Sequence, residues 1–279
     1  MDSSQKLTNT DVKKLNKNRI FRLIYNSDKI SRQEIADQLG LSLPTVNQNL
    51  KMLMEDGLIE YVGNFTSTGG RRAQAITIDN NARKAISVNI KADYINVDVV
   101  GLKGQIIYSM AVKAHFSKSR AYIEKLTDAV RHAVDYVGAD ADDILGVGVT
   151  VPGILDDEKQ ILISAPPLKA KNYDFTRLIS AIDYPVVVMN DARAEAYADH
   201  WFNGKPEDEK IYIMLGEGVG GAYINASAIR NGVHNRGGEF GHMVIHPGGK
   251  QCLCGKKGCF EAYVSEKVLS SELDMTLDN

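Results

Sequence analysis

The chain has few cysteines and no long apolar run. Only three of its 279 residues are cysteine, and an odd number of cysteines speaks against a disulfide framework. The longest apolar candidate, residues 144–155, is interrupted by glycine and is shorter than the ~18 residues that a membrane span needs. The N-terminus has no apolar core of a signal peptide. These absences predict a cytoplasmic protein that keeps its thiols reduced.

An excess of charge of either sign is also missing, since the formal net charge is only −2. The charge is unevenly divided. Residues 1–80 carry 11 basic and 9 acidic side chains, which is a net charge of +2, whereas the remainder carries −4. The small positive excess has the sign expected if the N-terminal part meets a polyanion.

The first eighty residues predict a winged helix-turn-helix. Apolar spacing indicates one helix over residues 16–26, and Ser31 with Glu34 forms a capping box that opens a second helix ending at Gly40. Ser42 can cap a third helix that ends near Gly57, with Pro44 in its first turn. Two short helices joined by a tight turn, the second rich in Thr, Asn and Gln, are typical of DNA-binding proteins.

Two short predicted strands, residues 58–62 and 75–78, follow these helices and would form the wing, with two arginines at its tip. Amide side chains near the start of a recognition helix can pair with adenine edges, and arginines can clamp phosphates or enter the minor groove. The predicted DNA-binding residues are Ser42, Thr45, Asn47, Gln48, Asn49, Arg71 and Arg72. The alternative is a small helical domain that binds a protein.

The three cysteines share one stretch near the C-terminus, at Cys252, Cys254 and Cys259. Three thiolates and one imidazole make a closed tetrahedral set for structural zinc, with His242 as the better fourth ligand and His246 as the alternative. The competing interpretation is three free thiols. A disulfide between Cys252 and Cys254, one residue apart, would be strained.

From about residue 85 the pattern changes to strands that alternate with helices, which predicts a mixed α/β sheet covered by helices. The strand over residues 185–189 ends in Asn190 and Asp191, at the position where open α/β sheets bind ligands. Asp191 could act as a general base toward a hydroxyl, or it could be the N-cap of the alanine-rich helix that follows.

Five motifs together resemble the ROK family of sugar kinases and sugar-responsive repressors, over residues 85–265. They are Val-Pro-Gly at 151–153, Asn-Asp-Ala-Arg-Ala-Glu at 190–195, the glycine loop 215–221, Gly-Glu-Phe-Gly-His at 238–242, and Cys-Leu-Cys-Gly-Lys-Lys-Gly-Cys-Phe-Glu at 252–261. The resemblance implies an actin-like (hexokinase-type) α/β domain. It also implies zinc ligands at His242, Cys252, Cys254 and Cys259, and sugar ligands at Asn190, Asp191, Glu239, His242 and Glu261.

Departures from the family pattern favour a regulator over a kinase. The family's kinases have Asp-x-Gly-Gly-Thr in the first hairpin, where this chain has Asn-Ile-Lys-Ala-Asp at 89–93, and Glu217 replaces the threonine of their Gly-Thr-Gly loop. A carboxylate in a phosphate cradle repels the nucleotide. We therefore expect no catalytic residue, although Asp191 matches the position of the kinase base.

The predicted organisation is a winged helix-turn-helix over residues 1–80 and a ROK sugar-binding domain over 84–279. The first lobe would be about 84–190 and the second lobe, incomplete because family repressors run roughly a hundred residues further, about 191–279. The predicted function is a sugar-responsive transcriptional regulator, most simply a repressor, that binds operator DNA as a homodimer and a monosaccharide effector. The alternatives are a sugar kinase with a DNA-binding extension and a repressor controlled by protein docking.

Overall fold

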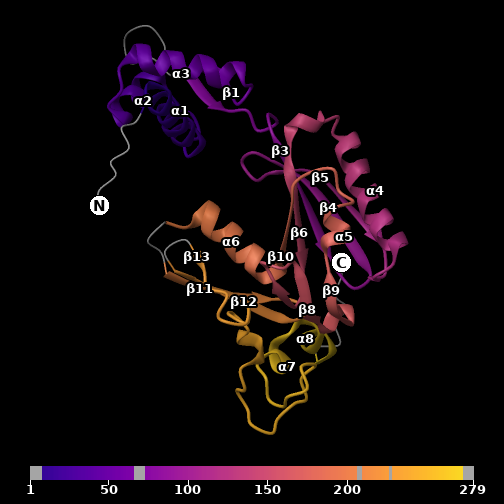
Figure 1. Ribbon diagram of the computed structural model, residues 1–279. Helices are drawn as coiled ribbons and strands as arrows, with labels where there is room; N and C mark the ends of the chain where they lie inside the picture. Colours follow the sequence, from indigo (N-terminus) through magenta and orange to yellow (C-terminus); the bar gives the residue numbers. More distant parts are fainter. Residues whose placement is uncertain (1–7, 66–72, 206–208, 226–227, 273–279) are drawn as a thin grey trace. The chain divides into compact units, whose positions relative to one another are not determined.

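The computed structural model describes residues 8–65, 73–205, 209–225 and 228–272 (Figure 1). The chain divides into two compact units. The first takes in the chain up to residue 85 together with 99–108 and 137–145, and the second takes in 86–98, 109–136 and the chain from 146 onward. Among the described residues, no helix combines the length and the apolar character that a bilayer crossing requires.

The first unit contains a winged helix. Its helices are α1 (Asn9–Tyr25), α2 (Arg32–Leu39) and α3 (Leu43–Glu55), and its strands β1 (Ile59–Asn64) and β2 (Gln74–Ile78) pair antiparallel. The capping box of α2 is present as predicted, and Gly40 ends the helix in the left-handed conformation, with φ of 63°. Helix α1 begins at Asn9, well before the predicted residue 16, because a second capping box joins Thr8 and Asp11.

A single apolar core holds the winged helix together. It is made of fully or almost fully buried aliphatic side chains from all three helices and both strands, among them Ile20, Ile35, Val46, Leu50 and Ile76. Burying a side chain of this size contributes about 1.5–3 kcal/mol. The core therefore stabilises the recognition helix without help from any ligand.

The turn between strands β4 (Tyr94–Gly101) and β5 (Ile106–Lys113) belongs to the same unit. Leu102 packs against the winged-helix core. Its carbonyl accepts a hydrogen bond from the Tyr25 hydroxyl at 3.0 Å, and the Lys103 ammonium donates to the Ser27 carbonyl at 3.0 Å. One apolar contact and two hydrogen bonds therefore hold this turn against the C-terminal end of α1.

The second unit is a mixed α/β structure, which confirms the predicted fold class. Its main sheet has the strand order β10-β6-β3-β4-β5, with β3 over Lys84–Ile90, β6 over Ile144–Val151 and β10 over Val186–Asn190. Strands β6 and β10 run parallel. Helix α4 (Arg120–Tyr136) turns an apolar face inward, with Leu126, Val130 and Ala133 buried (Figure 1).

Two smaller antiparallel sheets complete the second unit. One contains β7 (Ile154–Asp156), β8 (Ile161–Ala165) and β9 (Ala170–Asp174), which is followed by the short helix α5 (Thr176–Ile179). The other has the order β11-β12-β13, over Glu209–Leu215, Val219–Asn225 and Ala228–Ile229. Helix α6 (Asp191–Asn203) packs on the latter through Ala196, and the short helices α7 (Glu261–Val264) and α8 (Glu266–Glu272) follow the cysteine loop.

Candidate functional site

Three cysteines and one histidine converge near the C-terminus. One ligand atom from each of His242, Cys252, Cys254 and Cys259 lies within 4.8 Å of all the others. The Cys252 Sγ lies 3.7 Å from His242 Nδ1, and the Cys254 Sγ lies 3.6 Å from the Cys259 Sγ. A disulfide needs a sulfur–sulfur distance of about 2.05 Å, and all three cysteines are free thiols.

These separations fit a tetrahedral metal. Bonds of about 2.3 Å to sulfur and 2.0 Å to nitrogen place neighbouring ligand atoms roughly 3.5–3.8 Å apart. Burial raises the pKa of the Cys252 thiol to about 12. Cys252 therefore becomes a thiolate more readily when a cation is bound beside it. The three sulfurs and one nitrogen of the cluster are the donor set that zinc prefers.

The fold selects His242 over His246 for this cluster. His242 ends the short helical turn η3 (Phe240–His242), whereas the His246 Nδ1 lies 3.3 Å from the Tyr263 hydroxyl. The loop between them closes tightly, and a Cβ on Gly258 would come within 1.8 Å of the His246 carbonyl oxygen. His246 therefore contacts Tyr263 and lies outside the cluster.

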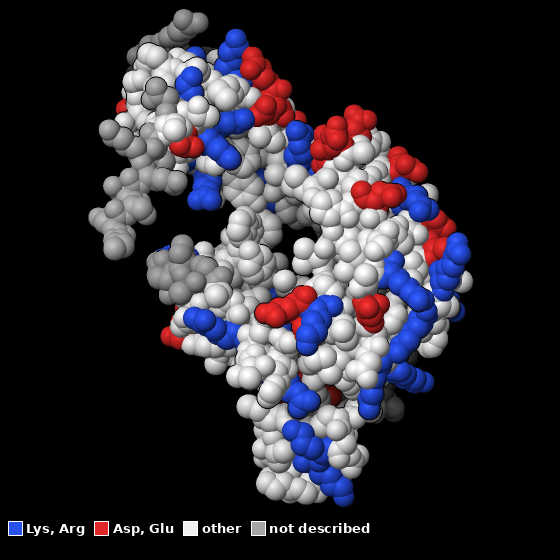
Figure 2. Space-filling view, viewed as in Figure 1, with Lys and Arg blue, Asp and Glu red and all other residues white. Residues whose placement is uncertain are grey.

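Positive side chains surround the cysteine loop. Figure 2 shows Lys and Arg gathered over the segment that is yellow in Figure 1, and this segment contains Lys250, Lys256 and Lys257. The Lys256 ammonium donates to the His242 carbonyl at 3.2 Å. Burial acts to raise the pKa of the Cys254 and Cys259 thiols, whereas the positive charge of Lys256 acts to lower it and so favours the deprotonated form that binds metal.

Two carboxylates flank the cluster. The Glu239 Oε2 lies 3.7 Å from His242 Nε2, the nitrogen that faces away from Cys252. The Glu261 Oε1 lies 3.7 Å from the Cys252 Sγ, and its Oε2 accepts a hydrogen bond from the Val219 amide at 2.9 Å. One nitrogen of His242 thus serves the cluster and the other faces a predicted effector ligand.

Asn190 and Asp191 stand together at the start of α6. The Asn190 Oδ1 accepts from the Arg193 amide at 3.0 Å, so Asn190 is the N-cap and the alternative that gave this role to Asp191 is wrong. The Asn190 Nδ2 donates to the Gly153 carbonyl and to Asp191 Oδ1, at 2.9 and 3.0 Å. Burial raises the pKa of the Asp191 carboxyl to about 6, against the opposing effect of a hydrogen bond from the Ala192 amide.

The glycine loop before β12 brings these distant groups to one place. A Cβ on Gly218 would meet Glu261 Oε2 at 3.0 Å, and one on Gly220 would meet the Ala192 Cβ at 2.7 Å. A Cβ on Gly221 would come within 2.6 Å of the Phe240 ring, just before His242. Only glycine permits the approaches at Gly220 and Gly221, and residues 218–221 therefore contact α6, η3 and α7.

Asp93 and Glu217, the two carboxylates that distinguish this sequence from the kinase pattern, each lie close to a basic side chain. The Asp93 Oδ1 lies 2.8 Å from His115 Nδ1, and the Glu217 Oε2 lies 3.2 Å from the Lys267 ammonium. Both carboxylates are largely exposed. Each of these exposed carboxylates therefore has a basic side chain as its neighbour.

The structure leaves part of the predicted DNA-binding set at the surface. Ser42, Asn47 and Gln48 are exposed, and the hydroxyls of Ser42 and Thr45 lie 2.9 Å apart at the start of α3. Asn49 is a correction. It is only 4% exposed and its amide donates to the Thr45 carbonyl at 2.8 Å, because its position in α3 points toward the core. Arg71 and Arg72 lie outside the described residues.

The second unit contains a buried ion pair that was not predicted from the sequence. Arg193 is 4% exposed, and its guanidinium donates to Asp157 Oδ2 at 3.1 Å and to the Asn235 carbonyl. Asn231 donates to the same Asp157 oxygen at 2.8 Å. The network joins the N-terminal turn of α6 to loops more than thirty residues away on either side, so no local pattern marks it.

Family models match two parts of the chain. The model of the ROK family matches residues 85–279, and a model of winged helix-turn-helix DNA-binding domains matches residues 15–60. The chain belongs to the ROK family. The match covers the glycine loop, both carboxylates and the cysteine cluster.

Curated ROK relatives of this chain are named as repressors and regulators. The xylose repressor of Bacillus subtilis is 30% identical over 268 residues, which are 95% of this chain and 69% of that protein. The DNA-binding transcriptional dual regulator NagC of Escherichia coli is 26% identical over 264 residues, 94% of this chain and 65% of NagC. The alignments thus include both the winged helix and the ROK domain.

Solved structures of ROK proteins share the fold. A ROK family transcriptional regulator, described as a homologue of the E. coli MLC protein, superposes with a TM-score of 0.68 at 24% identity and covers 94% of this chain and 67% of its own. A ROK family glucokinase from Streptomyces griseus, solved with glucose and AMPPNP, has a TM-score of 0.57 and 31% identity over 67% of this chain and 59% of its own. The kinase therefore matches a smaller part of the chain than the regulator does.

Proposed function

We propose that this ROK protein is a DNA-binding transcriptional repressor whose affinity for its operator changes when a monosaccharide binds. The observation that carries the proposal is the presence of both parts in one chain: a winged helix with a polar third helix, and a ROK domain. The xylose repressor and NagC, named for this kind of activity, align over both parts.

Asn190, Asp191, Glu239, His242 and Glu261 are proposed to bind the effector. A sugar ring offers hydroxyls in fixed directions, and carboxylates, an amide and an imidazole are the groups that accept from and donate to them. The contacts around residues 218–221 support a shared site, because α6, η3 and α7 all meet that segment. Bound zinc would hold His242 and the cysteine loop in place, which keeps Glu239 and Glu261 aligned.

Phosphate transfer is not part of the proposed function. The exposed carboxylates of Asp93 and Glu217 support this, because the resemblance to ROK kinases implies that a nucleotide would have to approach these two loops. Asp191 is proposed to act as a sugar ligand and not as a base. We expect binding as a homodimer on a palindromic operator, since repressors of this domain type read two half-sites.

The test is DNA binding to the promoter upstream of the protein's own gene, titrated with a panel of monosaccharides in the presence and absence of Mg-ATP. Release of the DNA by one sugar, with no effect of ATP and no sugar phosphate formed, supports the proposal. Phosphorylation of a sugar would replace it with the kinase function. DNA binding that no sugar alters would favour control by a protein partner.

A further inference from the structure

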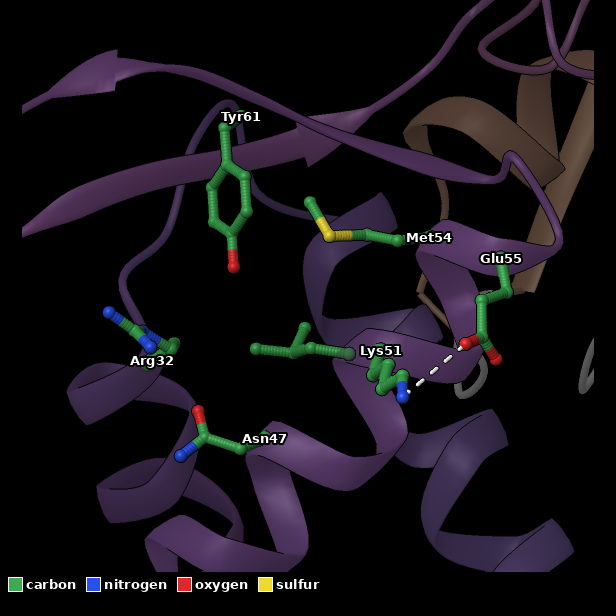
Figure 3. A pocket seen from close by; sticks show the side chains of 7 residues that line it. Arg32, Asn47, Lys51, Met54, Glu55 and Tyr61 are labelled. Carbon is green, nitrogen blue, oxygen red and sulfur yellow. Dashed lines mark ion pairs between the residues drawn. The ribbon is translucent and has the colours of Figure 1, made fainter.

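A groove on the winged helix lies beside the predicted base-reading residues. It has a volume of about 500 Å³ and is lined by Arg32 at the start of α2, five residues of α3, and Tyr61 on β1 (Figure 3). Its lining residues are Arg32, Asn47, Leu50, Lys51, Met54, Glu55 and Tyr61. All of them belong to the first unit, so the groove is a property of the winged helix alone.

The chemistry of the groove differs between its floor and its rim. The floor is apolar, formed by the buried Leu50 and the half-buried Met54. The rim carries an exposed guanidinium, an ammonium and a phenol hydroxyl, from Arg32, Lys51 and Tyr61. Figure 3 shows the Tyr61 hydroxyl directed into the groove from the strand side. Donors around an apolar floor suit a ligand with anionic oxygens and an apolar body.

We infer that this groove is a seat for the sugar–phosphate backbone of the operator, with Arg32 and Tyr61 as phosphate ligands. The inference rests on the proposed DNA-binding function. A recognition helix in the major groove has a phosphate backbone on each side of it. Asn47 lines the groove and is also among the predicted base-reading residues, so a backbone next to the bases that Asn47 reaches would pass along this rim.

The existing contacts of the rim donors are weak and replaceable. The Arg32 Nη2 lies 3.5 Å from the Gln74 Oε1, which is a long hydrogen bond. The Lys51 ammonium lies 3.7 Å from the Glu55 carboxylate, and both side chains are mostly exposed, at 77% and 63%. A phosphate can therefore take up these donors without breaking a buried interaction.

Glu55 makes the two ends of the groove differ in charge. Its carboxylate stands at the Met54 end of the groove and repels phosphate, whereas Arg32 and Asn47 lie at the other end (Figure 3). The backbone is therefore held toward Arg32 and Tyr61. It follows that removing the Glu55 charge strengthens DNA binding, while removing Arg32 or the Tyr61 hydroxyl weakens it.

The experiment measures binding of the full chain to a labelled 30-base-pair duplex of random sequence between 50 and 200 mM salt. Arg32→Ala should weaken binding about five- to tenfold at 100 mM salt and reduce the slope of log K against log salt by about 0.9, which is the value for one phosphate contact. Arg32→Lys should restore the slope. The Ser31–Glu34 capping box does not use the Arg32 side chain, so the helix should fold normally.

Two further variants separate a phosphate seat from a general effect of charge. Tyr61→Phe should weaken binding about two- to tenfold with the slope unchanged, because it removes a neutral donor. Glu55→Gln should strengthen binding about two- to fivefold, because a repulsive charge is lost. Arg131→Ala is the matched control, since Arg131 pairs with Asp128 on α4 and its loss should change nothing.

An unchanged salt slope in Arg32→Ala, with normal binding by the wild type, overturns the phosphate seat and leaves the proposed function standing. The same holds if Tyr61→Phe binds like the wild type. Failure of the wild type to bind both the random duplex and its own promoter DNA overturns the proposed function and the seat together. Thermal unfolding of each variant shows whether a loss of binding comes from a loss of folding.

Discussion

The winged helix and the segment from residue 216 to residue 261 are held together by different means. The winged helix has an apolar core contributed by three helices and two strands. The buried cluster in the cysteine loop consists of Cys252, Cys259 and Ala262, with Tyr263 packed against it, and its glycines permit close backbone contacts. The winged helix therefore has a large apolar core, whereas the cysteine loop has a small one together with close backbone contacts and a set of side chains able to bind a metal.

Loss of the metal cluster is the largest effect that the comparison predicts. His242→Ala should abolish zinc binding and loosen residues 244–261, because metal binding in small zinc sites contributes about 10 kcal/mol or more to folding. His246→Ala is the control and should retain zinc, since His246 contacts Tyr263 outside the cluster. Zinc content and amide hydrogen exchange measure both effects, with residues 46–53 as an internal reference. Equal zinc content in the two variants would contradict the role of His242, and not His246, as the fourth zinc ligand.

A cavity in the winged-helix core should give the next largest effect. Leu50 is 2% exposed in the core beneath α3, and Leu50→Ala should lower the free energy of unfolding of this unit by about 2–5 kcal/mol. Zinc content should not change. Denaturant unfolding followed by circular dichroism measures the loss. Release of zinc by this variant would show that the two regions are not independent.

The Asp191 carboxyl predicts a pH dependence that is confined to the second unit. Its pKa is raised from 3.8 to about 6 by burial, so the stability that it contributes is greatest below pH 3.8 and is lost as the pH rises through about 6. Asp191→Asn removes the buried charge and should be more stable than the wild type by about 3 kcal/mol at pH 7.5. The difference between the two proteins should shrink at pH 4.5. A difference that is the same at both pH values would contradict the burial argument.

The smallest predicted effect is that of a helix cap. Ser31 accepts from the Glu34 amide at 3.3 Å at the start of α2 and is buried. Ser31→Ala should cost about 1 kcal/mol of winged-helix stability, because one amide at the helix N-terminus loses its partner. Thermal unfolding measures the change, and Ser31→Thr should recover most of it. A loss as large as that of Leu50→Ala would mean that caps, and not the apolar core, dominate this unit.

Local signals carried most of the winged-helix prediction. The capping box at Ser31 and the glycine at the end of α2 act over a few residues, and the structure contains both. The two predicted strands are also present and pair antiparallel. The start of α1 was missed because Thr8 and Asp11 lie upstream of the apolar pattern. Asn49 was wrongly predicted to contact DNA, because residue type alone does not show which way a helical side chain points.

The residues of the possible metal cluster could also be predicted from the sequence, which favoured His242 over His246, and the structure brings His242 and the three cysteines together. The N-cap of α6 could not be predicted, and a contact in the folded chain gives this role to Asn190. The groove between Arg32 and Tyr61 and the buried pair of Arg193 with Asp157 join residues that are far apart in the chain. No short pattern encodes such pairs.

By itself the sequence determined the two-part organisation, the mixed α/β class and the residues able to bind a metal, because helix caps, strand alternation and ligand spacing are local properties. Only the tertiary structure decided which nitrogen of His242 faces the cysteines, that Asn49 is buried, and that residues 218–221 bring α6, η3 and α7 together. The physical reason is that these outcomes depend on how closely backbones approach and which face of an element is covered. Packing of the whole chain sets both.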